Sequence, residues 1–142
     1  LTQWYELPKI DIKSEWKKIQ DINEAVSKSL EISRDQNIIG SSLDAELILY
    51  LDQGMEDFLK PFSDELHFLF ITSSVELKKL SEAPMDATKG EGFAAMVESV
   101  DQNKCNRCWH KNKTVGKSKA HLELCSRCEG NISEDGESRS YF

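Results

Sequence analysis

Cysteine is absent from the first 104 residues of this 142-residue chain, and all four cysteines lie between positions 105 and 128. Secreted domains usually scatter cysteines to crosslink their loops, so this distribution is typical of an intracellular protein. No apolar run is long enough to span a membrane, and no basic-then-apolar segment at the start marks a secretion signal. The longest apolar stretch, Leu66 to Ile71, is short and contains His67. We therefore expect a soluble protein, and Leu at position 1 indicates a fragment or processed piece of a longer chain.

The sequence also lacks any pattern that spacing alone marks as catalytic. Its acidic residues are spread over predicted faces and loops, and no nucleophile is paired with a base. Gly116-Lys117-Ser118 resembles the end of a phosphate-binding loop, but that motif needs a glycine five positions earlier, where Lys111 stands. We expect no catalytic residues within this chain.

The four cysteines form two Cys-x-x-Cys pairs, Cys105 with Cys108 and Cys125 with Cys128, separated by 16 residues. This spacing is typical of a zinc site in which each pair forms a tight turn and all four thiolates are ligands. Four sulfurs leave no open position, so the single zinc ion would be structural. Disulfides and a redox dithiol are the alternatives, but a redox pair is normally single and begins a helix after a strand.

The metal module, roughly Asn103 to Phe142, is too small to hold an apolar core and needs its metal to fold. His110 and His121 lie between the cysteine pairs and could replace one ligand. Because the cysteine set is complete, we expect these histidines to be exposed polar residues or hydrogen-bond donors to the ligands.

Charge divides the chain into an acidic body and a basic tip, with a net charge of −7. Residues 1–102 carry 10 Lys/Arg and 20 Asp/Glu, whereas residues 103–142 carry 8 Lys/Arg and 5 Asp/Glu. A basic tip suits a polyanion, because neutralising phosphates releases counterions from nucleic acid. Ordinary solubilising charge around a metal site is the alternative.

Two side chains beside the first cysteine pair could read nucleic acid. Trp109 could stack on an unpaired base, which is worth about 1–3 kcal/mol, and Arg107 could grip a phosphate or a base edge. The alternatives are a packing lid and a solvated charge. The candidate RNA-binding residues are Arg107, Trp109, Lys111, Lys113, Lys117 and Lys119.

Periodicity in the acidic part predicts a small α+β domain followed by a zinc-ribbon-like module. Apolar residues three and four apart predict a helix from Ser14 to Arg34, with Asp11 or Ser14 as N-cap and Trp16 in the core. Alternation over residues 43–51 predicts a strand with one buried face. The remaining sequence predicts short helices at 55–62 and at about 66–69, the second of them capped by residues 63–65. It also predicts strands at 70–77 and 93–100, a loop at 83–92 and a linker at 101–103.

Several segments together resemble the C-terminal region of bacterial-type isoleucyl-tRNA synthetases. The zinc-binding tail of that family is similar to Lys104-Cys105-Asn106-Arg107-Cys108-Trp109-His110 followed by Cys125-Ser126-Arg127-Cys128. Upstream, the helix with Asn23-Glu24-Ala25-Val26, the turn Ile39-Gly40-Ser41-Ser42-Leu43-Asp44-Ala45-Glu46 and the segment from Glu65 to Ser73 resemble the family in the same order. Residues 1–12 carry no family motif, and the final Gly136–Phe142 is less basic than the family's usual end.

The resemblance implies that residues 1–102 are the C-terminal part of the anticodon-binding region and that residues 103–142 are the zinc-binding tail. It implies a monomeric cytoplasmic isoleucine–tRNA ligase that uses ATP and Mg²⁺ only in a catalytic domain absent here, with its His-x-Gly-His and Lys-Met-Ser-Lys-Ser signatures. The implied partners are the anticodon loop of isoleucine tRNA and the upstream catalytic and anticodon-binding domains, with no membrane. Arg107 and Trp109 match the family's Cys-x-Arg-Cys-Trp and are expected to contact the anticodon. A DNA-binding zinc tail like that of DNA glycosylases, or a purely structural zinc knot, are the alternatives.

Overall fold

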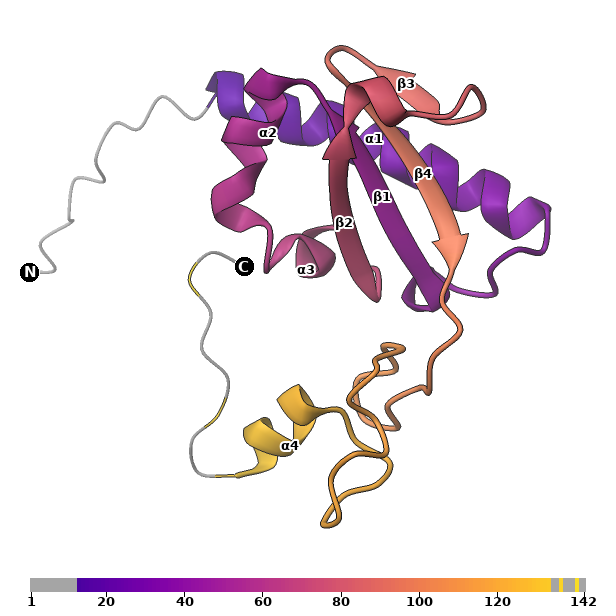
Figure 1. The fold of residues 1–142 in the computed structure, drawn as a ribbon, viewed down its shortest axis with the longest axis vertical. Coiled ribbons are helices and arrows are strands. Elements are labelled where there is room, and N and C mark those ends of the chain that lie inside the picture. Colours follow the sequence, from indigo (N-terminus) through magenta and orange to yellow (C-terminus); the bar gives the residue numbers. More distant parts are fainter. Residues whose placement is uncertain (1–12, 134–135, 137–139, 141–142) are drawn as a thin grey trace, which may run out of the picture.

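A computed structural model describes residues 13–133, 136 and 140, and it shows a mixed sheet packed on a long helix, with a separate small tail (Figure 1). The helices and strands, in chain order, are α1 (Lys13–Asp35), β1 (Ala45–Leu51), α2 (Gln53–Leu59), α3 (Leu66–Phe70), β2 (Ser74–Lys79), β3 (Thr88–Gly90), β4 (Phe93–Ser99) and α4 (Ser126–Ile132). Short 3₁₀ turns lie at Ser42–Asp44, Lys60–Phe62 and Leu80–Glu82. The predicted α+β class with a metal module is confirmed. The expected features of residues 1–12 and of most of the last nine lie outside the described residues.

The four strands are ordered β2-β1-β4-β3. β1 runs parallel to β2 and antiparallel to β4, so that Leu47 lies beside Val75 on one side and Val97 on the other. β3 and β4 form an antiparallel hairpin, which places a strand inside the predicted loop at 83–92. The predicted loop is therefore wrong at residues 88–90.

α1 buries one stripe of side chains against the sheet, and the stripe includes Ile22, Val26 and Leu30. Trp16, which we expected in the core, is instead 51% exposed. Six residues at 100° each place Trp16 about 120° around the helix from Ile22, so its side chain leaves the buried stripe. The helix begins at Lys13, so Ser14 lies inside the helix and is not its N-cap, while Asp11 lies outside the described residues.

The second face of β1 is also buried, which corrects the expectation of one buried face. Ile48 is 3% exposed, and it packs with Tyr50, Ala94 and Ala87 in a cluster separate from the main core. Leu80 and Ala83, from the segment that leads from β2 to β3, pack against this cluster. The segment therefore covers a face that alternation alone had assigned to solvent.

The region predicted as a strand at 70–77 begins as helix. α3 continues through Phe70 and ends at Ile71, whose φ of 54° lies in the left-handed region, and β2 starts only at Ser74. Glu65 precedes α3, but no side-chain cap hydrogen bond is made there. The predicted capping by residues 63–65 is therefore wrong at Glu65.

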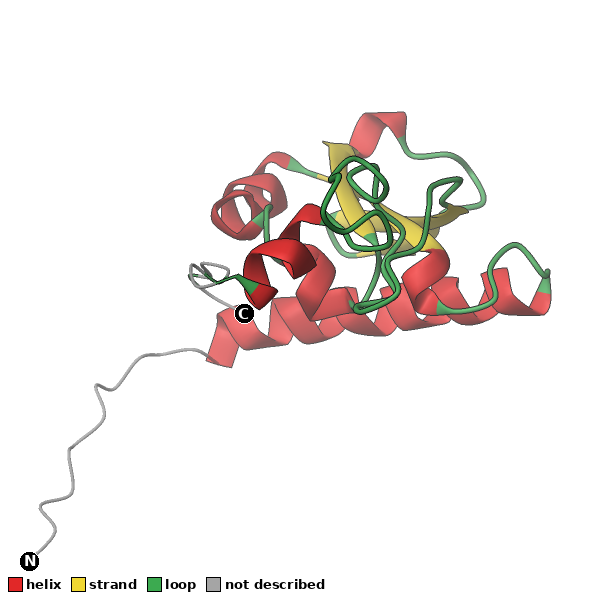
Figure 2. Ribbon diagram, turned by 90° about the horizontal axis from the view of Figure 1, so that it is seen from below, coloured by secondary structure: helices red, strands yellow, loops and turns green. Residues whose placement is uncertain are grey.

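The tail follows β4 and lies beyond the end of the sheet where β4 finishes (Figures 1 and 2). It contains an isolated antiparallel bridge between Lys104 and Lys111 and the short helix α4. Among the residues that the structure describes, no helix combines the length and apolarity needed to cross a membrane.

Candidate metal centre and its exposed surface

The tail is organised around the four cysteine side chains. The sulfur atoms of Cys105, Cys108, Cys125 and Cys128 all lie within 4.8 Å of one another. Cys108 is half-buried and the other three are buried, with Val115 and Leu124 packed around them. The sequence prediction that the two pairs meet is therefore confirmed, and the four thiols are free of disulfides.

The first cysteine pair lies in a tight turn held by main-chain hydrogen bonds. The Cys105 amide donates to the His110 carbonyl at 3.0 Å, and the Trp109 amide donates to the Cys105 carbonyl at 2.9 Å. The bridge between Lys104 and Lys111 closes the base of this turn. These bonds direct the sulfurs of Cys105 and Cys108 inward.

The second pair lies at the start of a helix. Cys125 is the N-cap residue of α4, its carbonyl accepts from the Glu129 amide at 3.0 Å, and Cys128 lies in the first turn. A helix start is one element of a redox dithiol, but within the described residues no strand leads into α4. Because the two sulfurs of the first pair lie beside this pair, the arrangement favours a metal site shared by all four cysteines over a redox dithiol.

The sulfur geometry fits zinc. A tetrahedron of sulfurs about 2.3 Å from zinc has edges of about 3.8 Å. The sulfurs of Cys108 and Cys125, one from each pair, are 3.7 Å apart. Four such ligands fill the coordination sphere, so the ion would hold the two turns together and would have no open position for substrate.

Backbone N–H groups donate hydrogen bonds that stabilise a thiolate at Cys105. Burial raises the pKa of the Cys105 thiol, but hydrogen bonds from the backbone at Cys108, Cys125 and Arg107 outweigh it and lower that pKa to about 6. Burial raises the pKa of Cys128 to about 12, although a hydrogen bond from Arg107 opposes part of the effect. A divalent cation is the partner that lets several such buried sulfurs ionise together.

The two histidines of the tail stand outside the cysteine cluster. His110 Nδ1 lies 3.1 Å from the Cys108 carbonyl, and the His110 ring packs edge-on against His67 with the ring centroids 6.0 Å apart. Burial lowers the pKa of His110, and nearby Arg127 lowers it further. His121 is exposed. The expectation that neither replaces a cysteine agrees with the composition of the cluster.

Trp109 is held at the surface directly after the first cysteine pair. Its backbone φ is 67°, in the left-handed region that residues other than glycine rarely occupy, and the residue is 60% exposed. Lys104 Nζ lies 5.3 Å from the centroid of the ring. A packing lid would be buried, so the exposure argues against that alternative for Trp109.

The predicted RNA-binding cations do not share one environment. Those with exposed side chains are Arg107, Lys113, Lys117 and Lys119. Lys111 is half-buried, and its ammonium donates to the Val100 carbonyl at 3.0 Å and lies 3.8 Å from an oxygen of Asp44. Lys111 is thus engaged with the body, which favours a structural role for it.

Two residues of the body that meet the tail, Asp44 and Ser73, were not singled out as site residues from the sequence. Asp44 lies near both Lys104 and Lys111, and the Ser73 hydroxyl accepts a hydrogen bond from the Lys111 amide at 2.8 Å. Both residues fall within segments that resembled the synthetase family, at Ile39–Glu46 and Glu65–Ser73. That resemblance was the only signal that marked them.

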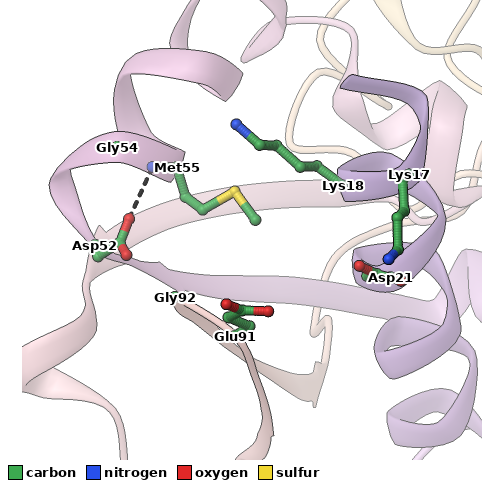
Figure 3. A pocket seen from close by; sticks show the side chains of 8 residues that line it. All are labelled: Lys17, Lys18, Asp21, Asp52, Gly54, Met55, Glu91 and Gly92. Carbon is green, nitrogen blue, oxygen red and sulfur yellow. Dashed lines mark hydrogen bonds between the residues drawn. The ribbon is translucent and has the colours of Figure 1, made fainter. Parts of the chain in front are cut away.

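A cavity of about 440 Å³ lies at the opposite end of the sheet, between the first turns of α1, the start of α2 and the hairpin of β3 and β4 (Figure 3). Asp52 at its edge accepts from the Met55 amide at 2.8 Å and so caps α2. The carboxylates and lysines around this cavity are surface charges, with no nucleophile–base pair among its lining residues.

Comparison with known proteins first gives the class of the tail. Residues 102–129 match the family described as "Zinc finger found in FPG and IleRS". Together with the four-cysteine cluster, this match establishes a structural zinc module.

Similarity extends from the zinc module over nearly the whole chain to isoleucine–tRNA ligases. The ligase of Saccharophagus degradans is 38% identical over 144 residues, which is 98% of this chain and 16% of that protein. The ligase of Alcanivorax borkumensis is 42% identical over 89% of this chain and 14% of its own length, and that of Halorhodospira halophila is 36% identical over 97% and 16%. The resemblance to the C-terminal region of isoleucyl-tRNA synthetases is thus confirmed, and the chain spans about a sixth of the length of these relatives.

Proposed function

We propose that this chain is the non-catalytic tRNA-recognition end of an isoleucine–tRNA ligase. One structural zinc ion, bound by Cys105, Cys108, Cys125 and Cys128, shapes the tail, and the tail contacts the anticodon loop of isoleucine tRNA. ATP-dependent aminoacylation then belongs to a catalytic domain elsewhere in a monomeric cytoplasmic parent enzyme. In this proposal residues 1–102 complete the anticodon-binding region and residues 103–142 form the tail.

The proposal rests on one observation, the exposure of Trp109 at the surface beside the first cysteine pair. A left-handed backbone costs an L-residue roughly 1–2 kcal/mol, and the first cysteine turn holds Trp109, a residue that is 60% exposed, in that conformation. Exposed aromatic rings beside cations are the usual platforms for unpaired bases. An anticodon loop offers such bases, whereas duplex DNA keeps its bases stacked.

The charge distribution supports the same surface. Arg107, Lys113, Lys117 and Lys119 are exposed around the cysteine cluster, whereas residues 1–102 carry twice as many acids as bases. Phosphates would therefore be attracted to the tail and repelled by most of the body. Binding should weaken with added salt because phosphate contacts release counterions.

A matched pair of tryptophan variants tests the stacking role. Trp109→Ala should weaken binding of the isoleucine anticodon stem-loop by about 5- to 150-fold, the equivalent of 1–3 kcal/mol of stacking. Trp16→Ala removes an exposed indole from α1 and should leave the affinity unchanged. Both proteins should retain one zinc ion per chain by elemental analysis. Equal affinities of the two variants would contradict the assignment of Trp109.

The same assay separates the two other functions. A DNA-binding tail, as in DNA glycosylases, predicts that damaged duplex DNA competes effectively with the stem-loop. A purely structural zinc knot predicts that substituting the exposed lysines Lys113, Lys117 and Lys119 by Gln has no effect on RNA affinity. The similarity to isoleucine–tRNA ligases across the body as well as the tail favours RNA.

A further inference from the structure

We propose that Asp44 and Ser73 position the zinc tail on the body. With Lys104 and Lys111 they form a latch, and this latch fixes the direction in which Trp109 faces. The effect of the latch on RNA binding depends on the function proposed above, whereas its effect on tail orientation does not.

The Ser73 half of the latch is a buried hydroxyl shared by the body and the tail. Ser73 is 8% exposed, its hydroxyl donates to the Leu43 carbonyl, and it accepts from the Lys111 amide at 2.8 Å. One side chain thus joins the entry of β1 to the base of the first cysteine turn. Its loss would leave the half-buried Lys111 amide and Leu43 carbonyl without this partner.

In the Asp44 half of the latch, the two carboxylate oxygens contact different parts of the molecule. Oδ2 accepts from the Ser41 amide at 3.0 Å and from the Ser41 hydroxyl at 3.2 Å, which fixes the turn before β1. Oδ1 faces the tail, 3.9 Å from Lys104 Nζ and 3.8 Å from Lys111 Nζ. Lys111 is held further by the Val100 carbonyl.

The latch reaches Trp109 through Lys104. Lys104 and Lys111 pair across the base of the first cysteine turn, so holding both of them restrains the whole turn. Lys104 Nζ also lies over the Trp109 ring, 5.3 Å from its centroid. Asp44, Lys104 and Trp109 therefore form a continuous series of contacts from the body to the proposed base-stacking surface.

A second contact supports the far side of the tail. The Arg127 guanidinium, in α4, lies 5.1 Å from the centroid of the Phe68 ring in α3. Separated contacts on the body, including the packing of His110 against His67, define the orientation of a small module, whereas a single contact would allow it to rotate. The latch is the polar contact that single substitutions can remove without touching a cysteine.

Residual dipolar couplings of the zinc-loaded 142-residue chain measure this orientation without RNA. If the latch holds, couplings from residues 45–99 and from residues 104–128 fit one alignment tensor. In Asp44→Asn, which retains an oxygen for Ser41, and in Ser73→Ala, the tail should acquire its own, smaller tensor. Asp86→Asn and Ser81→Ala alter exposed side chains elsewhere on the body and should keep the common tensor.

Separate tensors in the unsubstituted chain would overturn the proposal, and so would a common tensor in both latch variants. Zinc content and the dispersion of tail amide signals show whether each variant retains its folded module. Because Asp44→Asn and Ser73→Ala remove different contacts, a fold defect in one leaves the other decisive.

The affinity of Asp44→Asn for the stem-loop is a second readout, because the latch and simple electrostatics predict changes in opposite directions. Removing a negative charge near a basic surface should strengthen RNA binding by electrostatics alone. The latch predicts weaker binding instead, by roughly twofold or more, since coupling through a positioning contact is of order 0.5–2 kcal/mol. Stronger binding would contradict the latch. If the unsubstituted chain binds no RNA, the proposed function fails while the dipolar couplings still decide the latch.

Discussion

Lys104 and Trp109 form a cation–π pair at the surface of the zinc module, with the ammonium 5.3 Å from the ring centroid. The same ammonium lies 3.9 Å from an oxygen of Asp44, so the ring is linked to the body through one side chain. Such a pair contributes about 0.5–1 kcal/mol at an exposed site. In the proposed function, Lys104 orients the ring and supplies positive charge beside a base stacked on it.

Replacing Lys104 should affect both Trp109 and RNA. Lys104→Met keeps the aliphatic stem but removes the charge, so the stem-loop affinity should fall by about 2- to 5-fold, the equivalent of 0.5–1 kcal/mol. The Trp109 indole N–H signal should shift in the NMR spectrum at the same time. Lys89→Met removes an exposed lysine from β3 and serves as the control. An equal loss of affinity in both variants would show a general charge effect only.

Removing zinc should unfold the tail and spare the body. The sheet and α1 bury their own apolar core, whereas the only apolar cluster in the described tail is built around the cysteines. A chelator should therefore collapse the amide dispersion of residues 104–128 while the signals of β1 and β4 persist. Acid should act in the same direction, because burial raises the pKa values of Cys125 and Cys128 and protons compete with zinc for their sulfurs. A tail spectrum unaltered by chelator would contradict the metal site.

Burial of the second face of the sheet should contribute to the stability of the body. Ile48→Ala should lower the free energy of unfolding of the body by about 2–5 kcal/mol, because it leaves a cavity in the cluster with Tyr50 and Ala94. Trp16→Ala should cost clearly less, since that residue is half-exposed. Urea denaturation of both variants measures the difference. Similar small losses would mean that the segment after β2 does not cover this face.

Glycine at the hairpin between β3 and β4 is required by its backbone. Gly92 has a φ of 77°, and a Cβ there would lie 2.5 Å from an oxygen of Asp52. Gly92→Ala should therefore destabilise the body by about 1–3 kcal/mol. Gly54→Ala, in α2, meets its nearest atom at an ordinary 3.6 Å and should be neutral or slightly stabilising. Thermal unfolding of the pair provides the measurement, and equal melting temperatures would contradict the strain at Gly92.

Local patterns predicted the parts of this molecule that local physics determines. The spacing of Cys105, Cys108, Cys125 and Cys128 predicted the cluster because a metal-binding turn is encoded within four residues. The helix and the strands at 45–51 and 93–99 followed from apolar periodicity. Alternation failed at Ile48 and Tyr50 because the covering segment comes from residues 80–87, which no local pattern relates to β1.

The candidate site was only partly predictable for the same reason. Trp109 was identified from its position beside a cysteine, but its exposure and left-handed backbone depend on the folded turn. The sequence does not distinguish Lys111 from the other basic residues of the tail. Only the fold shows that it lies near Asp44, which is 67 positions earlier in the chain. Contacts between a body and its tail depend on tertiary structure, and charge counts carry no information about them.

The most direct test of the account is an NMR titration of the zinc-loaded chain with the isoleucine anticodon stem-loop, following the ring protons of each tryptophan. Base stacking on Trp109 predicts selective upfield shifts of its ring protons that saturate with RNA, while those of Trp16 stay unchanged. Saturable RNA binding with Trp109 unaltered, or no binding by the zinc-loaded chain, would contradict the claim that the zinc module presents this ring to an unpaired base.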